Sequence, residues 1–150
     1  MITFQEEHYS NFFTHEFMEL YKVHWEEIGS FDKQKIKLSP DWDKYRIMGK
    51  QNNLITFTIR NDRVLTGYNI FIITNHHHYK NTIIAENDIL YLKPEYRKGF
   101  TGYKFVKYCV EELKNKVDVI LLSMKASYTF ENIAKRLGFT LMDYKFILEV

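Results

Sequence analysis

A short basic segment has the residue types that bind phosphate groups. It reads Lys93-Pro94-Glu95-Tyr96-Arg97-Lys98-Gly99-Phe100-Thr101-Gly102, after an apolar stretch and before an amphipathic one. A glycine-containing loop at a helix start directs several backbone N–H groups toward one point, and the helix dipole adds partial positive charge there. Arg97 and Lys98 add full positive charges, so the loop suits a pyrophosphate. A plain turn between a strand and a helix is the alternative that this spacing leaves open.

Two carboxylates, Glu86 and Asp88, precede this loop on one expected strand. Because they are two residues apart, we expect them to face the same side of the strand, together with Leu90 and Leu92. A carboxylate among apolar groups is suited to general-base catalysis. A surface or salt-bridging role is the alternative for each.

Four segments have helical periodicity. Residues 14–28 form the first helix, ended by Gly29, and a short helix runs from an N-cap at Ser39 to about Gly49. The helix after the basic loop carries an apolar stripe of Phe105, Val106, Cys109, Val110 and Leu113. The last helix covers residues 129–137 and stops at Gly138. Cys109 lies on the apolar stripe, so we interpret it as a small core residue and not as a nucleophile.

Strand patterns fill most of the remaining chain. Residues 54–59 and 64–73 are expected to form an antiparallel hairpin, and residues 83–92 form the strand before the basic loop. Residues 118–124 are almost all apolar, which predicts a strand buried on both faces. Residues 139–150 supply one or two terminal strands. His76, His77 and His78 lie in a loop.

The resulting order, α-α-β-β-β-α-β-α-β, predicts the fold class. The hairpin strands are antiparallel, whereas the strand–helix–strand crossover requires parallel strands. We therefore expect an α/β fold with a mixed, mostly antiparallel sheet and helices on both faces. A chain of 150 residues without an obvious linker is expected to form a single domain.

Composition excludes several classes of protein. Apolar residues make up 45% of the chain and aromatic residues 17%, as in globular proteins. The single cysteine excludes an internal disulfide and a cysteine-rich zinc site, and the histidine run has no partners that complete a metal site. The N-terminus lacks a signal-peptide pattern, and no apolar run is long enough to span a membrane. We expect a cytoplasmic protein without a bound metal.

The chain resembles the GNAT superfamily of N-acetyltransferases, and more narrowly the acetyltransferases of tailed bacteriophages. The resemblance covers nearly the whole chain and is strongest between Leu92 and Gly102. The residues that carry it are His24-Trp25-Glu26-Glu27, Gly67-Tyr68, His77-His78-Tyr79, residues 88–92, Pro94-Glu95-Tyr96-Arg97-Lys98-Gly99, Gly102 and Arg136-Leu137-Gly138-Phe139. Two positions depart from the superfamily pattern: Phe100 replaces a loop glycine, and Ala134 replaces a tyrosine that many relatives use as general acid.

The resemblance implies how the chain holds acetyl-CoA. The sheet is splayed at the acyl-CoA site, and the pyrophosphate lies on backbone N–H groups of the loop. The pantetheine arm extends along Leu90 and Leu92, where a backbone N–H polarises the thioester. The implied cofactor-binding residues are Leu90, Leu92, Arg97, Lys98, Gly99, Phe100, Thr101 and Gly102.

The resemblance also implies catalytic and acceptor-binding residues. Glu86 and Asp88 are the candidate bases, and Tyr128 and Tyr144 are the candidate acids. The candidate substrate-binding residues are His24, Glu27 and His78. Packing is the alternative for His24 and for both tyrosines, and a solvated loop is the alternative for His78.

The implied function is acetyl-CoA-dependent transfer of an acetyl group to an amine, by direct attack in a ternary complex. The amine belongs to a small molecule or to a protein, and a homodimer is possible. An alternative function, of a different class, is that of a GNAT-fold interaction protein of phage origin that has lost catalytic turnover and binds a host partner. A third is a nucleic-acid binder that uses Lys93, Arg97, Lys98, Lys104 and Lys107, although the net charge of +2 does not favour it.

Overall fold

The computed structural model describes residues 1–29, 36–148 and 150. The strands are β1 (Ile2–Glu7), β2 (Leu54–Asn61), β3 (Val64–His76), β4 (Tyr79–Leu92) and β5 (Val119–Leu121). The helices are α1 (Tyr9–Phe12), α2 (His15–Ile28), α3 (Trp42–Lys50), α4 (Thr101–Leu113) and α5 (Glu131–Arg136), with a short 3₁₀ helix η1 (Pro94–Tyr96).

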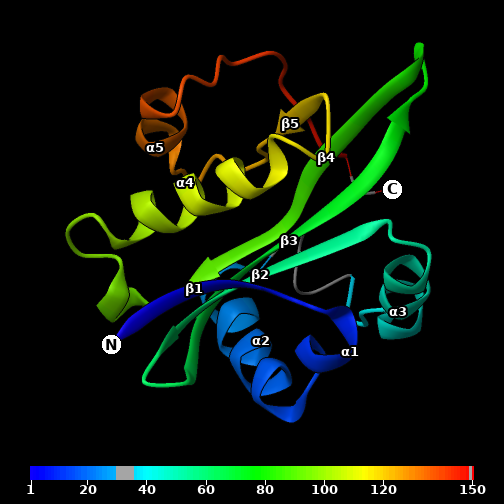
Figure 1. The fold of residues 1–150 in the computed structure, drawn as a ribbon. Coiled ribbons are helices and arrows are strands. Elements are labelled where there is room, and N and C mark those ends of the chain that lie inside the picture. Colours follow the sequence, from blue (N-terminus) through cyan, green and yellow to red (C-terminus); the bar gives the residue numbers. More distant parts are fainter. Residues whose placement is uncertain (30–35, 149) are drawn as a thin grey trace.

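One sheet joins the strands of the described residues, in the order β1-β2-β3-β4-β5. Neighbours from β1 to β4 are antiparallel, whereas β5 is parallel to β4. Figure 1 shows α4 and α5 on one face of the sheet and α1, α2 and α3 on the other. The predicted fold class, a mixed and mostly antiparallel sheet with helices on both faces, is therefore confirmed.

The predicted element order is wrong at its start, because the chain begins with a strand. β1 pairs with β2 along its whole length, from Ile2 opposite Asn61 to Glu7 opposite Thr56. Glu7 also accepts a hydrogen bond from Arg60 Nε of β2 at 2.7 Å, and both side chains are largely buried. The apolar–polar alternation of β1 is only six residues long and ends in two acidic residues, so its pattern is weak.

The structure confirms the bounds of the first long helix and corrects the predicted N-cap of the second. α2 begins after Thr14, whose hydroxyl accepts the Phe17 N–H at 3.4 Å, and it ends at Ile28 before Gly29, as predicted. Ser39 is not the N-cap of α3, because the helix begins two residues later than expected. Asp41 Oδ1 accepts the Lys44 N–H at 2.9 Å, and a carboxylate is as good an N-cap as a serine hydroxyl.

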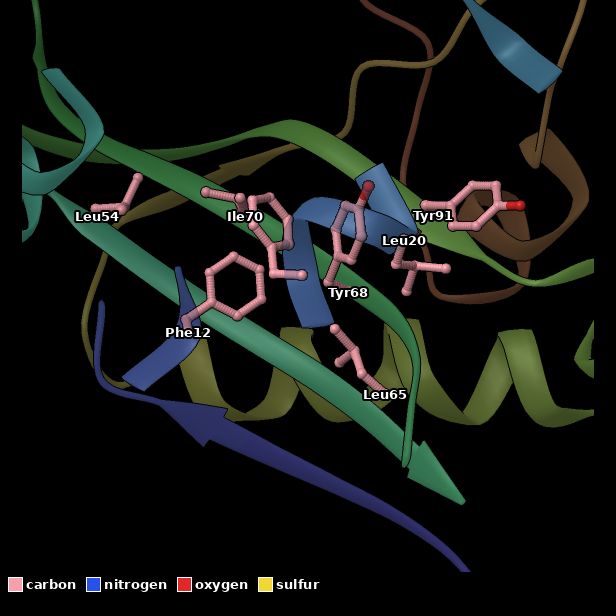
Figure 2. Packing of buried hydrophobic residues seen from close by; sticks show 8 residues of the cluster. Phe12, Leu20, Leu54, Leu65, Tyr68, Ile70 and Tyr91 are labelled. Atoms are coloured by element: carbon pink, nitrogen blue, oxygen red, sulfur yellow. The ribbon is translucent and has the colours of Figure 1, made fainter. Parts of the chain in front are cut away.

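A hydrophobic core on each face of the sheet holds these layers together. The core beneath α1, α2 and α3 includes Phe12, Phe17, Leu20, Leu54, Leu65, Tyr68, Ile70 and Tyr91. In Figure 2, Tyr68 lies between Ile70 and Leu20, and Tyr91 lies beside them on the neighbouring strand. The core beneath α4 includes Phe57, Ile59, Phe71, Leu92, Phe105 and Cys109. Burial raises the pKa of the Cys109 thiol, which agrees with the predicted core role of this residue.

The histidine run forms a tight hairpin and not an open loop. β3 extends to His76 and β4 already begins at Tyr79, so only His77 and His78 lie in the turn. The strand predicted from residue 83 is therefore four residues longer at its start. Figure 1 shows that the β3–β4 hairpin projects far beyond the rest of the sheet. His78 lies in the turn at its tip, between the end of β3 and the start of β4.

Two predictions for the C-terminal part are wrong. β5 covers only three residues, and Val119 is 38% exposed, so this strand is not buried on both faces. Residues 139–148 and 150 form no strand, although one or two terminal strands were predicted there. Their large apolar side chains are instead exposed, with Phe146 at 97%.

Among the described residues, no helix has both the length and the apolar character that crossing a membrane requires.

Candidate active site

The sheet opens between β4 and β5 directly after Glu86. Only the pairs Ile84–Val119, Ala85–Ile120 and Glu86–Leu121 join the two strands. The buried side chain of Asn87 then spans the opening: its Nδ2 donates to Ser123 O at 3.1 Å, and its Oδ1 accepts the Ser123 N–H at 2.5 Å. β4 continues to Leu92 without β5 beside it. The strands are therefore splayed where the resemblance implies.

A pocket of about 910 Å³ lies at this opening. Its lining includes Tyr21 and His24 from α2, Asp88, Leu90 and Leu92 from β4, and Tyr128 from the segment before α5. Pockets for small molecules commonly have volumes of about 300–1,000 Å³ and apolar walls with a few polar groups. The size and the lining are therefore those of a small-molecule site.

The unpaired edge of β4 presents backbone groups to this opening. The Lys93 N–H donates to Thr66 O on β3 at 2.9 Å. Because strand backbone groups alternate in direction, the N–H groups of Leu90 and Leu92 face away from β3, toward the missing β5 partner. Arg97 Nε donates to Leu92 O on this side at 2.7 Å. A ligand that pairs with this edge therefore meets a free N–H at Leu90.

The loop between η1 and α4 collects further backbone donors. The first N–H of this turn that has a backbone acceptor is that of Lys104, which donates to Phe100 O at 2.9 Å. Within the described chain, the N–H groups from Lys98 to Tyr103 donate to no protein acceptor. Gly99 has a φ of +67°, a left-handed conformation that favours glycine. The loop thus provides the unsatisfied helix-start donors that bind anions.

Phe100 replaces a glycine of the superfamily pattern without filling the loop. It is the N-cap residue of α4, and its side chain is 62% exposed. The aromatic ring therefore lies at the protein surface beside the backbone donors.

The charge of Arg97 is directed away from this anion site. Arg97 Nη1 donates to Glu27 Oε1 at 2.5 Å, and its Nε is bound by Leu92 O. We expected Arg97 to add full positive charge to the loop, but the carboxylate of Glu27 neutralises it. Among the two basic residues of the loop, Lys98 is the exposed one.

Glu27 is the centre of a hydrogen-bonded cluster at the pocket wall. Its Oε1 also accepts from the Tyr128 hydroxyl at 2.6 Å, and its Oε2 accepts from the Tyr91 hydroxyl at 2.7 Å. The hydrogen bond from Arg97 is the main cause that lowers the pKa of Glu27 to about 2. Glu27 is therefore an anion that orders its neighbours and not a proton acceptor.

A β-bulge separates the two candidate bases. Ile70 of β3 pairs with Ile89, whereas the adjacent Phe71 pairs with Asn87, so Asp88 is an extra residue in β4. The expectation that Glu86, Asp88, Leu90 and Leu92 share one face is wrong, because this extra residue breaks the two-residue alternation. Leu90 and Leu92 pack on the α4 side of the sheet.

The bulge leaves the two carboxylates in different surroundings. Asp88 lines the pocket, and its Oδ2 accepts a hydrogen bond from the Tyr45 hydroxyl. Glu86 does not line this pocket; its Oε1 accepts from the Ser123 hydroxyl at 2.9 Å and lies 3.5 Å from Lys145 Nζ. Of the two candidates, Asp88 is the one with access to a ligand in the pocket.

His24 occupies the pocket wall with one ring nitrogen engaged. Its Nδ1 lies 2.8 Å from the Tyr68 hydroxyl, and its ring stacks on Tyr91 with centroids 4.6 Å apart. Burial lowers the pKa of His24 to about 4, and the positive charge of Lys125 acts in the same direction. His24 is therefore neutral near pH 7 and adds no charge to the pocket.

Tyr144 and His78, like Glu86, are candidate residues that do not line this pocket. Tyr144 is 77% exposed in the C-terminal segment, and His78 lies in the β3–β4 turn, where its N–H donates to His76 Nδ1 at 3.0 Å. Neither lines the pocket. Tyr128, in contrast, combines a pocket position with hydrogen bonds to Glu27 and Arg97. Within the described residues, no three His, Cys, Asp or Glu side chains form a group that could hold a metal ion.

Two residues that shape the site, Tyr45 and Asn87, are not predicted as site residues from the sequence. Tyr45 follows the helical apolar spacing of α3, which predicts packing and gives no sign of its hydroxyl partner. Asn87 is the middle residue of a polar run, Glu86 to Asp88, that interrupts the apolar part of β4, and such a run is a usable signal for a break in pairing.

Comparisons with known proteins address the fold. The chain matches no protein-family model and no curated protein sequence. Solved structures match over nearly their full length. One is a predicted acetyltransferase from Clostridium acetobutylicum with acetyl-CoA, which has 13% identity, a TM-score of 0.68 and coverage of 99% of this chain and 96% of the other.

Two further structures are similar at the same level. An aminoglycoside acetyltransferase from an uncultured soil metagenomic sample has 11% identity, a TM-score of 0.70 and coverage of 99% and 97%. Glucosamine-6-phosphate N-acetyltransferase from Arabidopsis thaliana has 11% identity, a TM-score of 0.70 and coverage of 99% and 98%. The chain therefore has the fold of the GNAT acetyltransferases.

Proposed function

We propose that this protein is an acetyl-CoA-dependent N-acetyltransferase that transfers the acetyl group directly to an amine. One observation carries the proposal: the unpaired N–H groups at the start of α4 adjoin a pocket along the open edge of β4. A pyrophosphate joined to an extended amide chain and a thioester matches this arrangement of donors. The GNAT fold adds support, although fold by itself does not determine function.

The loop and the β4 edge would hold acetyl-CoA through main-chain groups. The N–H groups of Lys98, Gly99, Phe100, Thr101 and Gly102 are available to the pyrophosphate, with Lys98 as the exposed cation. Leu90 and Leu92 would line the pantetheine arm, and the Leu90 N–H would donate to the thioester carbonyl. Arg97 would act by fixing the loop to β4 and α2, since its guanidinium already binds Leu92 O and Glu27.

Bound acetyl-CoA supplies a thioester whose carbonyl carbon is the electrophile. Asp88 would take a proton from the acceptor's ammonium group, and the free amine would then form the new C–N bond. As the C–S bond breaks, the Tyr128 hydroxyl would give its proton to the sulfur, while the acylated nitrogen would lose its second proton to water and the Tyr128 phenolate would later regain one. Arg97 Nη1 lies 3.2 Å from the Tyr128 oxygen and would stabilise the phenolate that results. Glu86 and Tyr144 lack this access to the pocket.

His24 would contact the acceptor as a neutral group, and Glu27 would support the site through Tyr91 and Tyr128. Three of the similar structures suggest acceptor amines: the aminoglycoside acetyltransferase, the glucosamine-6-phosphate N-acetyltransferase and a ribosomal-protein-alanine N-acetyltransferase from Brucella melitensis. These three amines define a rational first panel for this chain.

The test is release of free thiol from acetyl-CoA in the presence of sisomicin, glucosamine 6-phosphate or an alanine-terminated peptide. We expect turnover with at least one amine, and mass spectrometry should find the acetyl group on that amine. An Asp88→Asn variant that still binds acetyl-CoA provides the control for enzyme-dependent transfer. Absence of acetyl-CoA binding to the wild-type protein at millimolar ligand would overturn the proposal.

A second candidate function is a GNAT-fold interaction protein that binds a host partner without turnover. The exposed apolar residues of the C-terminal segment favour it, since such stretches are uncommon on monomers: Leu141, Met142, Tyr144, Phe146, Ile147 and Leu148. Exposed Phe100 at the loop agrees with it. This function predicts a tight complex with a partner and no dependence on acetyl-CoA, whereas a homodimer predicts twice the chain mass in light scattering.

A bacteriophage origin and a location in the host cytoplasm are further proposals, which rest on the sequence resemblance. Neither alters the expected chemistry of the site.

A further inference from the structure

We propose that Tyr45 is a positioning residue that holds the Asp88 carboxylate in the orientation in which it accepts the proton of the amine. This inference rests on the function proposed above. Its basis is the hydrogen bond from the Tyr45 hydroxyl of α3 to Asp88 Oδ2 of β4. The two residues are 43 positions apart, so the bond joins two separate elements.

Asp88 needs such a partner because the sheet does not fix its side chain. It is the extra residue of the bulge between the pairs Ile70–Ile89 and Phe71–Asn87. A bulged residue has no partner opposite it, so cross-strand packing does not define its direction. The residue is also exposed and lines the pocket, so it is not buried in the core. A contact from another element is therefore what sets its orientation.

Tyr45 is suited to this task because its ring is held on several sides. The ring centroid lies 5.3 Å from that of Trp42 and 5.9 Å from that of Phe13. α3 itself lies close to α1: a Cβ on Gly49 would lie 2.3 Å from Tyr9 Cγ. Burial and the hydrogen bond to Asp88 both raise the pKa of Tyr45, so its hydroxyl keeps its proton as a donor.

The hydrogen bond occupies only one oxygen of the carboxylate. Tyr45 binds Oδ2, and no donor among the described residues binds Oδ1. Oδ1 is therefore the oxygen available to an incoming ammonium group. One carboxylate oxygen is fixed by a hydrogen bond and the other is available to the substrate. This is the arrangement expected for a general base that a neighbouring residue orients.

The experiment is a double-mutant cycle on the full chain with Tyr45→Phe, Asp88→Asn and the double variant. The probe amine is n-butylamine, which is small enough to enter the pocket whatever the natural acceptor is. Tyr45→Phe should lower kcat/KM for n-butylamine about tenfold, and Asp88→Asn about a hundredfold or more. Adding Tyr45→Phe to Asp88→Asn should change the rate less than about twofold, because the Tyr45 hydroxyl no longer has a carboxylate base to orient.

Tyr79→Phe is the matched control, because Tyr79 is an exposed tyrosine at the start of β4 outside the pocket. Melting temperature and acetyl-CoA affinity should be similar in the control and in Tyr45→Phe. Independent, multiplicative effects of Tyr45→Phe and Asp88→Asn would overturn the inference, since a purely structural tyrosine acts without Asp88. Wild-type protein that binds acetyl-CoA but does not acetylate n-butylamine would also overturn it, while the acetyl-CoA site would stand. Loss of acetyl-CoA binding in the wild type would instead count against the proposed function itself.

Discussion

The two ends of the pocket are built in different ways. At the α4 end, the polar groups beside the pocket are backbone N–H donors, those from Lys98 to Tyr103, of which Gly102 lines the pocket, and those along the edge of β4. At the α2–α3 end, the side chains of His24 and Asp88 line the pocket, and Tyr45 binds Asp88 from α3 without lining the pocket itself. The backbone end tolerates changes of side chain, as the exposed Phe100 illustrates. The side-chain end depends on particular atoms, so we expect it to be far more sensitive to substitution.

The largest expected effect is at the side-chain end. Asp88→Asn removes the proposed base and should lower kcat about 10²–10⁴-fold, the usual contribution of general-base catalysis. Acetyl-CoA affinity should stay within about twofold, because the loop is untouched. Glu86→Gln is the contrast, since Glu86 binds the Ser123 hydroxyl and does not itself line the pocket, and its kcat should be close to that of wild type. Steady-state kinetics measures kcat of both variants. A larger loss of kcat in Glu86→Gln than in Asp88→Asn would contradict the role of Asp88 as the base.

Glu27→Gln should have an intermediate effect, on stability, that involves residues at both ends of the pocket. The substitution leaves the half-buried guanidinium of Arg97 without its counter-charge and weakens the hydrogen bonds from Tyr91 and Tyr128. We expect a loss of about 2 kcal/mol in the free energy of unfolding, since the pair is partly exposed to water. Urea denaturation measures this loss. Unchanged stability would show that the cluster does not hold α2 to the loop.

The pH dependence of stability should show a smaller effect from His24. Its pKa is about 4 in the folded protein and about 6.5 when unfolded, so below pH 6.5 the unfolded state binds a proton that the folded state does not. Stability should therefore fall as pH decreases from 6.5 to 4, by at most about 1.4 kcal/mol per pH unit. The stabilisation from Glu27 is lost only below about pH 4.5, so the window between 6.5 and 4.5 isolates His24.

Thermal melts of the wild type and His24→Gln across this pH window provide the measurement. The variant should lose most of the pH dependence between 6.5 and 4.5. An equal slope in both proteins would assign the effect to other groups.

The difference between the backbone end and the side-chain end of the pocket also explains which features could be predicted from the sequence. The loop from Arg97 to Gly102 is a local pattern, and its position between a strand and a helix was predicted correctly. The partners of its charges were not, because Arg97 meets Glu27 across 70 positions of the chain. The bulge at Asp88 was missed for a related reason, since it arises from pairing with β3 and has no signature in β4 alone.

The terminal segments show the limits of periodicity. β1 has a short alternating pattern that was not recognised as a strand, yet it pairs fully with β2. Residues 139–148 alternate at least as clearly, but the structure gives them no pairing partner. Alternation thus describes which residues suit a strand, whereas pairing requires a free neighbouring edge at the right place.

The most direct measurement of the central claim is calorimetric titration of acetyl-CoA into the wild type, Thr101→Glu and Thr101→Gln. Thr101 is the first residue of α4, where a carboxylate favours the helix but repels a bound pyrophosphate. We predict micromolar binding to the wild type and about fivefold weaker binding to Thr101→Glu than to Thr101→Gln, with no loss of stability. Equal affinities of the two variants, or no binding to the wild type, would contradict an acetyl-CoA site at this helix start.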